Sequence, residues 1–461
     1  MTWPIAPGVV RGERIVVAGE ITPATLHLAG GRIMRLSHVD DVGAARATDV
    51  LDAGELLVIP GLVDTHVHIN EPGRTEWEGF ASATRAAAAG GVTTLLDMPL
   101  NSIPATINPE ALAKKRESAA HTCHVDVGFL GGLVPGSIGD LPHLWADGVF
   151  GFKCFLVPSG VDEFRNVTLS DVSKAMPTLA RLRAPLLVHA ELPEQIEAAT
   201  AEVLEDDPRR YATYLASRPP SAEVEAVEAI VDLARRYNAR VHIVHVSSSE
   251  VIPILRDARA DRVLVTAETC PHYLAFSAEQ IPDGATQFKC APPIRDNANR
   301  ERLWGALQEG VLDFIVSDHS PCPPALKRMD SGNFFEAWGG VASLELTAAV
   351  IVTQMRARSI PLAHLARWMC EAPTHLARGG LQRCKGRLAP GYHADFVLLD
   401  DAETVIVDPD RLHQRHPVTP YAGLSLHGRV HATYLHGQLV CSEGDLVGPP
   451  SGRLLRRESV A

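Results

Sequence analysis

The sequence predicts an α/β protein in which eight parallel strands close into a barrel and both chain ends form a smaller β-domain. Two observations carry this prediction. The middle of the chain repeats one unit, a short apolar run followed by a polar turn and a helical stretch. The two ends instead carry short alternating segments punctuated by glycine and aspartate.

The strand candidates lie between about residues 60 and 320. They span residues 61–68, 91–99, 124–132, 149–156, 185–191, 239–247, 262–269 and 312–320. Strands that alternate with helices pair in parallel through right-handed crossovers, and eight of them close into a (β/α)8 barrel of the TIM type. An open, doubly wound sheet is the structural alternative. The barrel is favoured because its mouth gathers residues from many strands around one point.

Residues 221–238 illustrate the helices between the strands. Ser221 is expected to cap this helix, and Glu223 and Glu225 suit its first turn. Apolar side chains recur along one face, at Val224, Val227, Ile230, Val231 and Ala234. This spacing predicts a helix with one buried face.

The two ends differ from the middle in their pattern. Residues 1–58 and 386–461 contain small strand-like segments and hairpins. Because neither end alone is long enough to bury a sheet face, we expect them to pair into one composite β-sandwich. Residues 59–385 then form the barrel domain.

Composition excludes several classes of protein. The chain has 461 residues, 46% hydrophobic and 21% charged, which is typical of a soluble globular protein. Its net charge of -12 argues against a nucleic-acid partner. The absence of a secretory signal pattern and of a long apolar window predicts a cytoplasmic protein with no membrane partner. The eight dispersed cysteines, with no CxxC pair, are expected to be reduced and mostly buried.

Side chains that can bind metal fall at or near the ends of the apolar runs. His66 and His68 are two residues apart in a predicted strand, so both imidazoles share one face and can chelate one ion. The other members of the set are Lys153, His189, His245 and Asp318. A single histidine at a strand end is more often a hydrogen-bonded core residue or an exposed one. The joint placement of the set indicates a metal site at one mouth of the barrel.

The donor types point to a pair of ions. Four imidazoles and one carboxylate suit zinc, cobalt, manganese or iron(II). Four histidines are too many for one catalytic ion with an open position, whereas two ions about 3.5 to 4 Å apart can share the set. An ammonium at Lys153 would be repelled by two dications, but its carbamate, formed with CO2, is an anionic ligand with two oxygens. The alternative is a lysine paired with an acid.

Longer motifs connect the chain to a family. It resembles the cyclic-amidohydrolase branch of the amidohydrolase superfamily, and within that branch it is similar to the allantoinases. The resemblance rests on DTHVHINEPGRTEWEGF, GFKCFLVPSGVDEF, AETCPHYL, KCAPPIRD, SDHSPC, WGGVASLE and KGRLAPGYHADFVLLD. It implies that carboxylated Lys153 (N6-carboxylysine) bridges two divalent ions, most commonly zinc. His66, His68 and Asp318 then hold one ion, and His189 and His245 hold the other. It also implies a homotetramer.

The resemblance implies hydrolysis of the ring amide of allantoin to allantoate, in purine catabolism, with Asp318 moving the proton. A purely coordinating Asp318 is the alternative role. Dihydroorotases typically carry an arginine where this chain has Asn70, and a histidine where it has Cys322. Both differences favour a neutral substrate, because an anionic one needs a cationic partner. A hydantoinase or dihydropyrimidinase is the nearest enzyme alternative. A non-catalytic scaffold would show a gap among the six positions, and the sequence has none.

Substrate contacts are less closely specified. Asn70 and Asn101 are candidates to bind the ureido arm of allantoin, although asparagine in such loops commonly caps a turn. Resemblance to hydantoinases implies that backbone groups at Ala291 and Gly340 hold the ring. Residues 155–167, which follow Lys153, form either a lid over the substrate or a plain surface loop.

Overall fold

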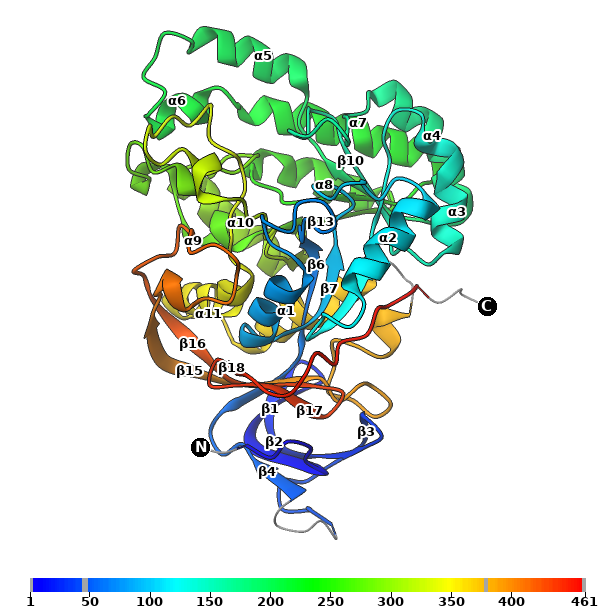
Figure 1. Cartoon of the computed structure of the whole chain (residues 1–461), viewed down its shortest axis with the longest axis vertical. Coiled ribbons are helices and arrows are strands. Elements are labelled where there is room, and N and C mark those ends of the chain that lie inside the picture. Colours follow the sequence, from blue (N-terminus) through cyan, green and yellow to red (C-terminus); the bar gives the residue numbers. More distant parts are fainter. Residues whose placement is uncertain (1–2, 44–48, 377–379, 458–461) are drawn as a thin grey trace.

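The computed structural model describes residues 3–43, 49–376 and 380–457. Figure 1 shows a helix-covered barrel above a sheet to which both ends of the chain contribute. The predicted (β/α)8 barrel with a composite β-domain is confirmed.

Eight strands form the barrel, and each lies inside one of the eight predicted segments. They are β6(Leu62–Val67), β7(Val92–Asp97), β8(Asp126–Phe129), β10(Phe152–Phe155), β11(Leu186–His189), β12(Val241–Ile243), β13(Val265–Thr269) and β14(Phe314–Ile315). A short additional strand, β9(Gly131–Gly132), pairs with β10.

All barrel pairings are parallel, as the alternation of strands and helices predicts. The strands form two runs, β6-β7-β8 and β9-β10-β11-β12-β13-β14. Leu130 alone separates β8 from β9. At the other junction Val67 bridges His319 in parallel, and the His68 amide donates to the His319 carbonyl at 2.8 Å. The sheet therefore closes on itself.

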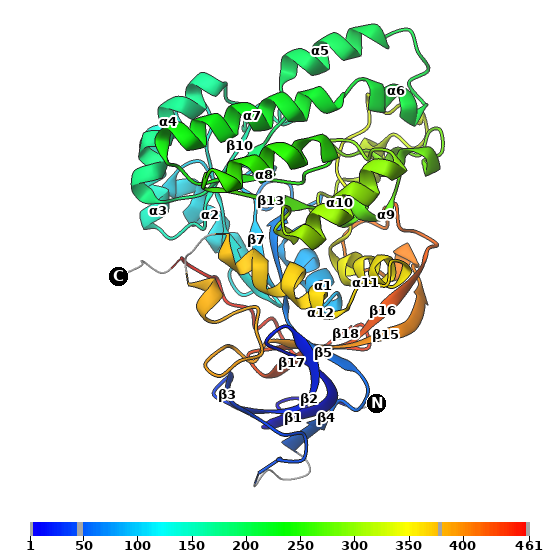
Figure 2. The same cartoon turned by 180° about the vertical axis from the view of Figure 1, so that it is seen from behind.

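Helices surround the barrel, and Figure 2 shows α4, α7, α8 and α10 covering its far side. The helices are α1(Phe80–Ala89), α2(Pro109–Ala119), α3(Leu141–Ala146), α4(Leu169–Leu182), α5(Pro193–Glu202), α6(Tyr211–Ala216), α7(Pro220–Tyr237), α8(Ile252–Ala260), α9(Pro271–Ala275), α10(Asn297–Glu309), α11(Thr347–Ala357) and α12(Ala363–Ala366).

Helix α7 corrects one detail of the sequence prediction. It begins at Pro220 with Pro219 as the N-cap, so Ser221 does not cap it. Proline suits the first helical position because its missing N–H would have no intrahelical partner there. The predicted apolar face is confirmed, with Val227, Ile230, Val231 and Ala234 buried and Val224 partly buried against the core.

The remaining strands make one nine-stranded sheet in the order β18-β17-β16-β15-β5-β1-β2-β3, with β4 paired to β1. They are β1(Val9–Val17), β2(Glu20–Ala29), β3(Arg32–Ser37), β4(Val50–Asp52), β5(Leu57–Pro60), β15(Phe396–Ile406), β16(Ser425–Leu435), β17(Gln438–Ser442) and β18(Asp445–Leu446). Strand β5 joins the two ends, because it is parallel to β1 and antiparallel to β15.

This sheet has its own core, which draws Val10, Leu26 and Val58 from the first end and Phe396 and Tyr434 from the other. The composite origin of the β-domain therefore rests on both pairing and packing. All eight cysteines are free, seven of them buried, as the sequence analysis expects. Among the described residues, no helix combines the length and apolar character needed to cross a bilayer.

Candidate active site at the mouth of the barrel

A cavity of about 450 Å³ opens at the carboxyl ends of the barrel strands. His66 lies in β6 and His68 directly follows that strand, while His189 is the last residue of β11. His245 and Asp318 follow β12 and β14. All five side chains line the cavity, and each of these residues is at most 7% exposed. The structure therefore brings together five positions that are spread over about 250 residues of sequence.

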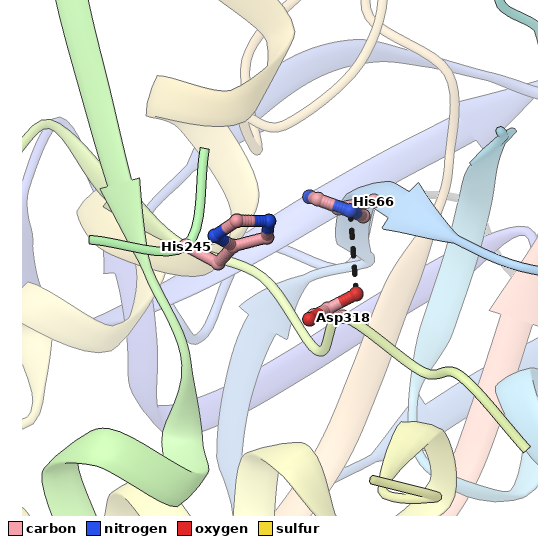
Figure 3. A group of neighbouring side chains, drawn as sticks. All are labelled: His66, His245 and Asp318. Carbon is pink, nitrogen blue, oxygen red and sulfur yellow. Dashed lines mark ion pairs between the residues drawn. The ribbon is translucent and has the colours of Figure 1, made fainter. Parts of the chain in front are cut away.

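Asp318 lies between the first two histidines. Its Oδ1 is 3.3 Å from His66 Nε2 and 3.6 Å from His68 Nε2. Figure 3 shows His245 beside His66 and Asp318, and ligand-type atoms of these three residues lie within 4.8 Å of one another. Three donor atoms thus face one point.

His189 and His245 form a second convergence. His189 Nδ1 is 3.1 Å from His245 Nε2, and the two rings meet edge to face with centroids 4.7 Å apart. Two nitrogens bound to one tetrahedral zinc at about 2.0 to 2.1 Å are about 3.3 Å apart. The separation in this chain is close to that value, so the pair can hold one ion without rearrangement.

Lys153 lies in β10 and is fully buried. Its Nζ has no hydrogen-bond partner and lies 4.9 Å from the centroid of the Phe155 ring. Burial lowers the pKa of Lys153 to about 8, although the nearby carboxylates of Asp318 and Glu268 act in the opposite direction. A buried amine without a partner is costly unless another group completes its environment.

Two buried carboxylates hold the ring orientations of His66 and His189. Glu268 Oε1 is 2.5 Å from His66 Nδ1, and its other oxygen is 2.9 Å from His242 Nε2. Glu191 Oε2 is 2.7 Å from His189 Nε2. Each carboxylate thus contacts the ring nitrogen that faces away from the candidate metal position, as the outer partners of metal-binding histidines commonly do.

Neighbouring side chains stabilise the negative charges of these two carboxylates. Burial raises the pKa of Glu191, but Arg218, 2.5 Å away, and His189 outweigh it, so the pKa falls to about 2. Burial and the two histidines act on Glu268 in the same way, and its pKa is also about 2. Neither residue was predicted as a site residue from the sequence. Glu191 could have been found as a polar side chain two residues after His189, on the same face of the predicted strand of residues 185–191.

The backbone is strained at this mouth. His245 and Asp318 have φ angles of 38° and 45°, and Asn70 and Asn101 have 68° and 64°. Such left-handed conformations cost about 1 to 3 kcal/mol each and persist only where surrounding contacts enforce them. One such contact is the bond from the Ser317 amide to Asp64 Oδ2 at 3.0 Å, next to Asp318. The strain falls on predicted site residues.

A further pair of residues converges on Asp318. Donor atoms of Cys270 and His272 lie within 4.8 Å of its carboxylate. Both ring nitrogens of His272 are buried without a hydrogen-bond partner, and burial lowers the pKa of His272 to about 3. This histidine is therefore neutral, and sequence analysis did not identify it.

The predicted substrate contacts divide into two groups. Asn101, Ala291 and Gly340 line the cavity. Asn70 is buried and is not among the lining residues, and its amide donates to the Pro321 carbonyl at 3.4 Å. The loop after Lys153 contributes Val157, Pro158, Ser159 and Gly160 to the wall. Whether this loop is a lid stays a prediction.

Gly340 occupies a position that only glycine fits. Its φ of 128° is strained for any other residue, and a Cβ there would lie 2.4 Å from the Ser320 carbonyl oxygen. The backbone of the cavity wall therefore approaches the loop after Asp318 as closely as sterics allow.

Comparisons with known proteins agree with this geometry. The model of the amidohydrolase family matches residues 57–440. The allantoinase of Streptomyces avermitilis is 46% identical over 451 residues, which cover 98% of this chain and 98% of that protein. The chain belongs to the amidohydrolase family. The allantoinase of Arabidopsis thaliana is 42% identical and covers 96% of this chain and 90% of that protein. The family resemblance found in the sequence motifs is confirmed.

Solved structures extend the comparison to the fold. An L-hydantoinase from Arthrobacter aurescens superposes with a TM-score of 0.92 at 28% identity, over 98% of this chain and 100% of that one. A dihydropyrimidinase from Brevibacillus agri superposes with a TM-score of 0.87 at 27% identity, over 98% and 99%. The cavity described above thus lies in a member of the family with a hydantoinase-like fold.

Proposed function

We propose that this member of the amidohydrolase family is an allantoinase, a cyclic amidase that hydrolyses the hydantoin ring of allantoin to allantoate. One observation carries the proposal. Five of the six proposed ligand positions line one cavity, and Lys153 is buried beside the ring of Phe155, which also lines it, in a chain that is related over nearly its whole length to proteins named allantoinases.

We further propose that the site holds two divalent ions. His66, His68 and Asp318 would hold one, and His189 and His245 the other, with Lys153 between them as N6-carboxylysine formed with CO2. The unpartnered, buried Nζ of Lys153 supports the modification, because a carboxylate there would bring compensating contacts. Zinc suits the imidazole-rich set best, although cobalt, manganese and iron(II) accept the same donors.

When bound, such ions supply Lewis acidity and lower the pKa of water. The residues of the chain supply orientation and proton transfer. Glu268 and Glu191 fix the rings of His66 and His189. Asp318 Oδ1 faces the two histidines, and Ser320 Oγ donates to the same oxygen at 3.0 Å. We assign to Asp318 the transfer of a proton from the attacking water to the departing ring nitrogen.

For the substrate, we propose contacts from Asn101, Ala291 and Gly340, which line the cavity. Asn70 is a weaker candidate because its amide is occupied by the Pro321 carbonyl. Its Oδ1 is buried and without a partner, so a contact through that oxygen is compatible with the structure.

Three further expectations are proposals as well. The eight free cysteines support a cytoplasmic location. A homotetramer follows from the family resemblance, and light scattering on the purified protein tests it. The division into a β-domain of residues 1–58 and 386–461 and a barrel of residues 59–385 is supported by the sheet in which β5 joins both ends.

The decisive experiment offers zinc-loaded protein allantoin, hydantoin, dihydrouracil and dihydroorotate in parallel. The proposal predicts the highest kcat/KM for allantoin. Preference for dihydroorotate or dihydrouracil would assign the chain to another cyclic-amidase activity. Asp318→Asn serves as the catalytic control, because it keeps the side-chain volume and removes the proton acceptor.

A further inference from the structure

One wall of the cavity is made by the loop of residues 335–340. Phe335 is 38% exposed and Glu336 is also exposed, so the loop lies on the solvent side of the cavity. The five ligand-type side chains are buried and form the floor. A bound ring must therefore present its scissile amide to the floor, and its substituents can extend toward the loop.

Two lysines hold this loop through its carbonyl groups. Lys289 Nζ donates to the Ala337 carbonyl at 2.6 Å and to the Phe335 carbonyl at 3.2 Å. Lys327 Nζ donates to the carbonyls of Trp338, at 3.0 Å, and Gly340. Lys289 lines the cavity, whereas Lys327 is 4% exposed and does not. The two amines thus share a structural task, but only one can touch a ligand.

The Lys289 ammonium has a donor to spare. A lysine ammonium carries three N–H groups and no acceptor, and the two loop carbonyls account for two of them. The remaining contact is the Tyr214 ring, whose centroid is 5.3 Å from Nζ. Among the described residues, no carboxylate lies within ion-pair distance of Lys289. Arg218, the other cationic side chain that lines the cavity, is instead paired with Glu191 at 2.5 Å.

The surroundings of Lys289 leave its charge incompletely compensated. Burial lowers the pKa of Lys289 to about 7, and the positive charges of Arg218 and Lys327 act in the same direction. At neutral pH the amine of Lys289 is therefore only partly protonated, and only its ammonium form has a third N–H. An additional acceptor favours that form, because a partly desolvated ammonium without a counter-charge gains more from an acceptor than one that is fully hydrated.

We propose that Lys289 determines substrate specificity by donating its third N–H to the carbonyl oxygen of the ureido arm of allantoin. This inference rests on the proposed function. The arm is neutral, offers one strong acceptor, and is borne on the ring carbon beside the scissile amide, from which it can extend toward the loop. An unsubstituted hydantoin ring places no acceptor there. Lys289 thus binds the ureido arm, while the side chains on the floor of the cavity act on the ring.

The test combines two variants with two substrates in zinc-loaded, full-length protein. Allantoin is compared with hydantoin, the same ring without the arm. Lys289→Met should lower kcat/KM for allantoin about 10- to 100-fold, chiefly through KM, as expected for one lost hydrogen bond from a charged donor. Because Lys289 also holds the loop through two carbonyls, a smaller loss is expected with hydantoin as well. The loss with allantoin should exceed the loss with hydantoin by about 10-fold or more, because only allantoin carries the arm to which the lysine is coupled.

Lys327→Met is the matched control. It removes an amine that holds the same loop but does not line the cavity, so any loss should affect both substrates equally. Lys289→Gln guards against misfolding of the methionine variant. Its polar amide is one bond shorter than the lysine side chain and carries no charge and only two N–H donors, so it should show the same selective loss.

Several results would overturn the inference while leaving the proposed function intact. Equal losses on both substrates in Lys289→Met would make Lys289 a structural clamp like Lys327. Unchanged allantoin hydrolysis would remove it from recognition. Undetectable opening of hydantoin by the wild type would mean that the arm contributes more than one donor can supply. If the wild type opened hydantoin but not allantoin, the proposed function and this inference would fail together.

Discussion

Lys385→Met should destabilise the junction between the barrel and the sheet formed by the chain ends. Lys385 Nζ lies 2.6 Å from Asp126, at the start of β8, and 2.6 Å from Asp395, just before β15. All three side chains are at most 4% exposed. Removing the ammonium leaves two buried carboxylates with His436 as their remaining side-chain partner, and breaking a buried ion pair in this way typically costs about 3 to 5 kcal/mol.

The size of the effect can be converted to a melting temperature. Unfolding entropy is about 2.1 cal/mol/K per residue, which gives about 1 kcal/mol/K for 461 residues that unfold together. A loss of about 3 to 5 kcal/mol should therefore lower Tm by about 3 to 5 °C in calorimetry at neutral pH. Lys174→Met is the control, because Lys174 is 66% exposed and lies 3.8 Å from Asp171. Such a surface change should stay within about 0.5 kcal/mol.

The pH dependence of stability tests whether Lys385 favours the ionised form of Asp126. Burial raises the pKa of Asp126, but Lys385 and His436 outweigh it, so the pKa lies below its usual range. In the wild type this carboxylate contributes stability above the unfolded pKa of about 3.9, and the contribution is lost as the pH falls through the folded pKa. Without Lys385, burial favours the protonated form of Asp126, so the deficit of the variant should shrink in acid. A Tm equal to that of the wild type, or a deficit that grows in acid, would refute the reasoning.

Two further predictions concern the cavity. Glu268→Gln should weaken zinc affinity or activity about 10- to 100-fold, because it loosens the ring of His66. The measurement is activity as a function of buffered free zinc. An unchanged zinc dependence would contradict the positioning role of Glu268. Gly340→Ala should lower kcat/KM by about tenfold or more, because its Cβ would clash with the Ser320 carbonyl and displace the wall. Gly339→Ala is the matched control, since the nearest atom to its Cβ would be 4.0 Å away, and equal activities of the two variants would remove the steric argument.

The local pattern of residues was sufficient to predict the strands and to select five side chains that line one cavity. Barrel strands are short apolar runs, and a polar residue at the carboxyl end of such a run must face the mouth. His66 and His189 were found in this way, and the structure places both beside the cavity. The two chain ends were predicted to form one β-domain because neither could bury a sheet face alone. The pairing of β5 with β1 and β15 confirms this prediction.

Contacts between residues far apart in the chain could not be predicted from the local pattern of the sequence. Glu268 is 202 residues from His66, and Lys385 is 259 residues from Asp126. In the sequence, a charged residue that is buried and paired cannot be distinguished from an exposed one, because its partner is brought close only by the fold. Asn70 illustrates the converse, because its amide meets the carbonyl of Pro321, 251 residues away, rather than lining the cavity.

The central claim is that Lys153 carries a carboxylate between two ions, and zinc-loaded, active crystals test it most directly. Electron density at the tip of Lys153 and anomalous scattering beside it should reveal a carboxylated amine flanked by two metal peaks, with His66, His68 and Asp318 around one and His189 and His245 around the other. A free amine at Lys153 in active protein, or a single metal peak at full activity, would contradict it.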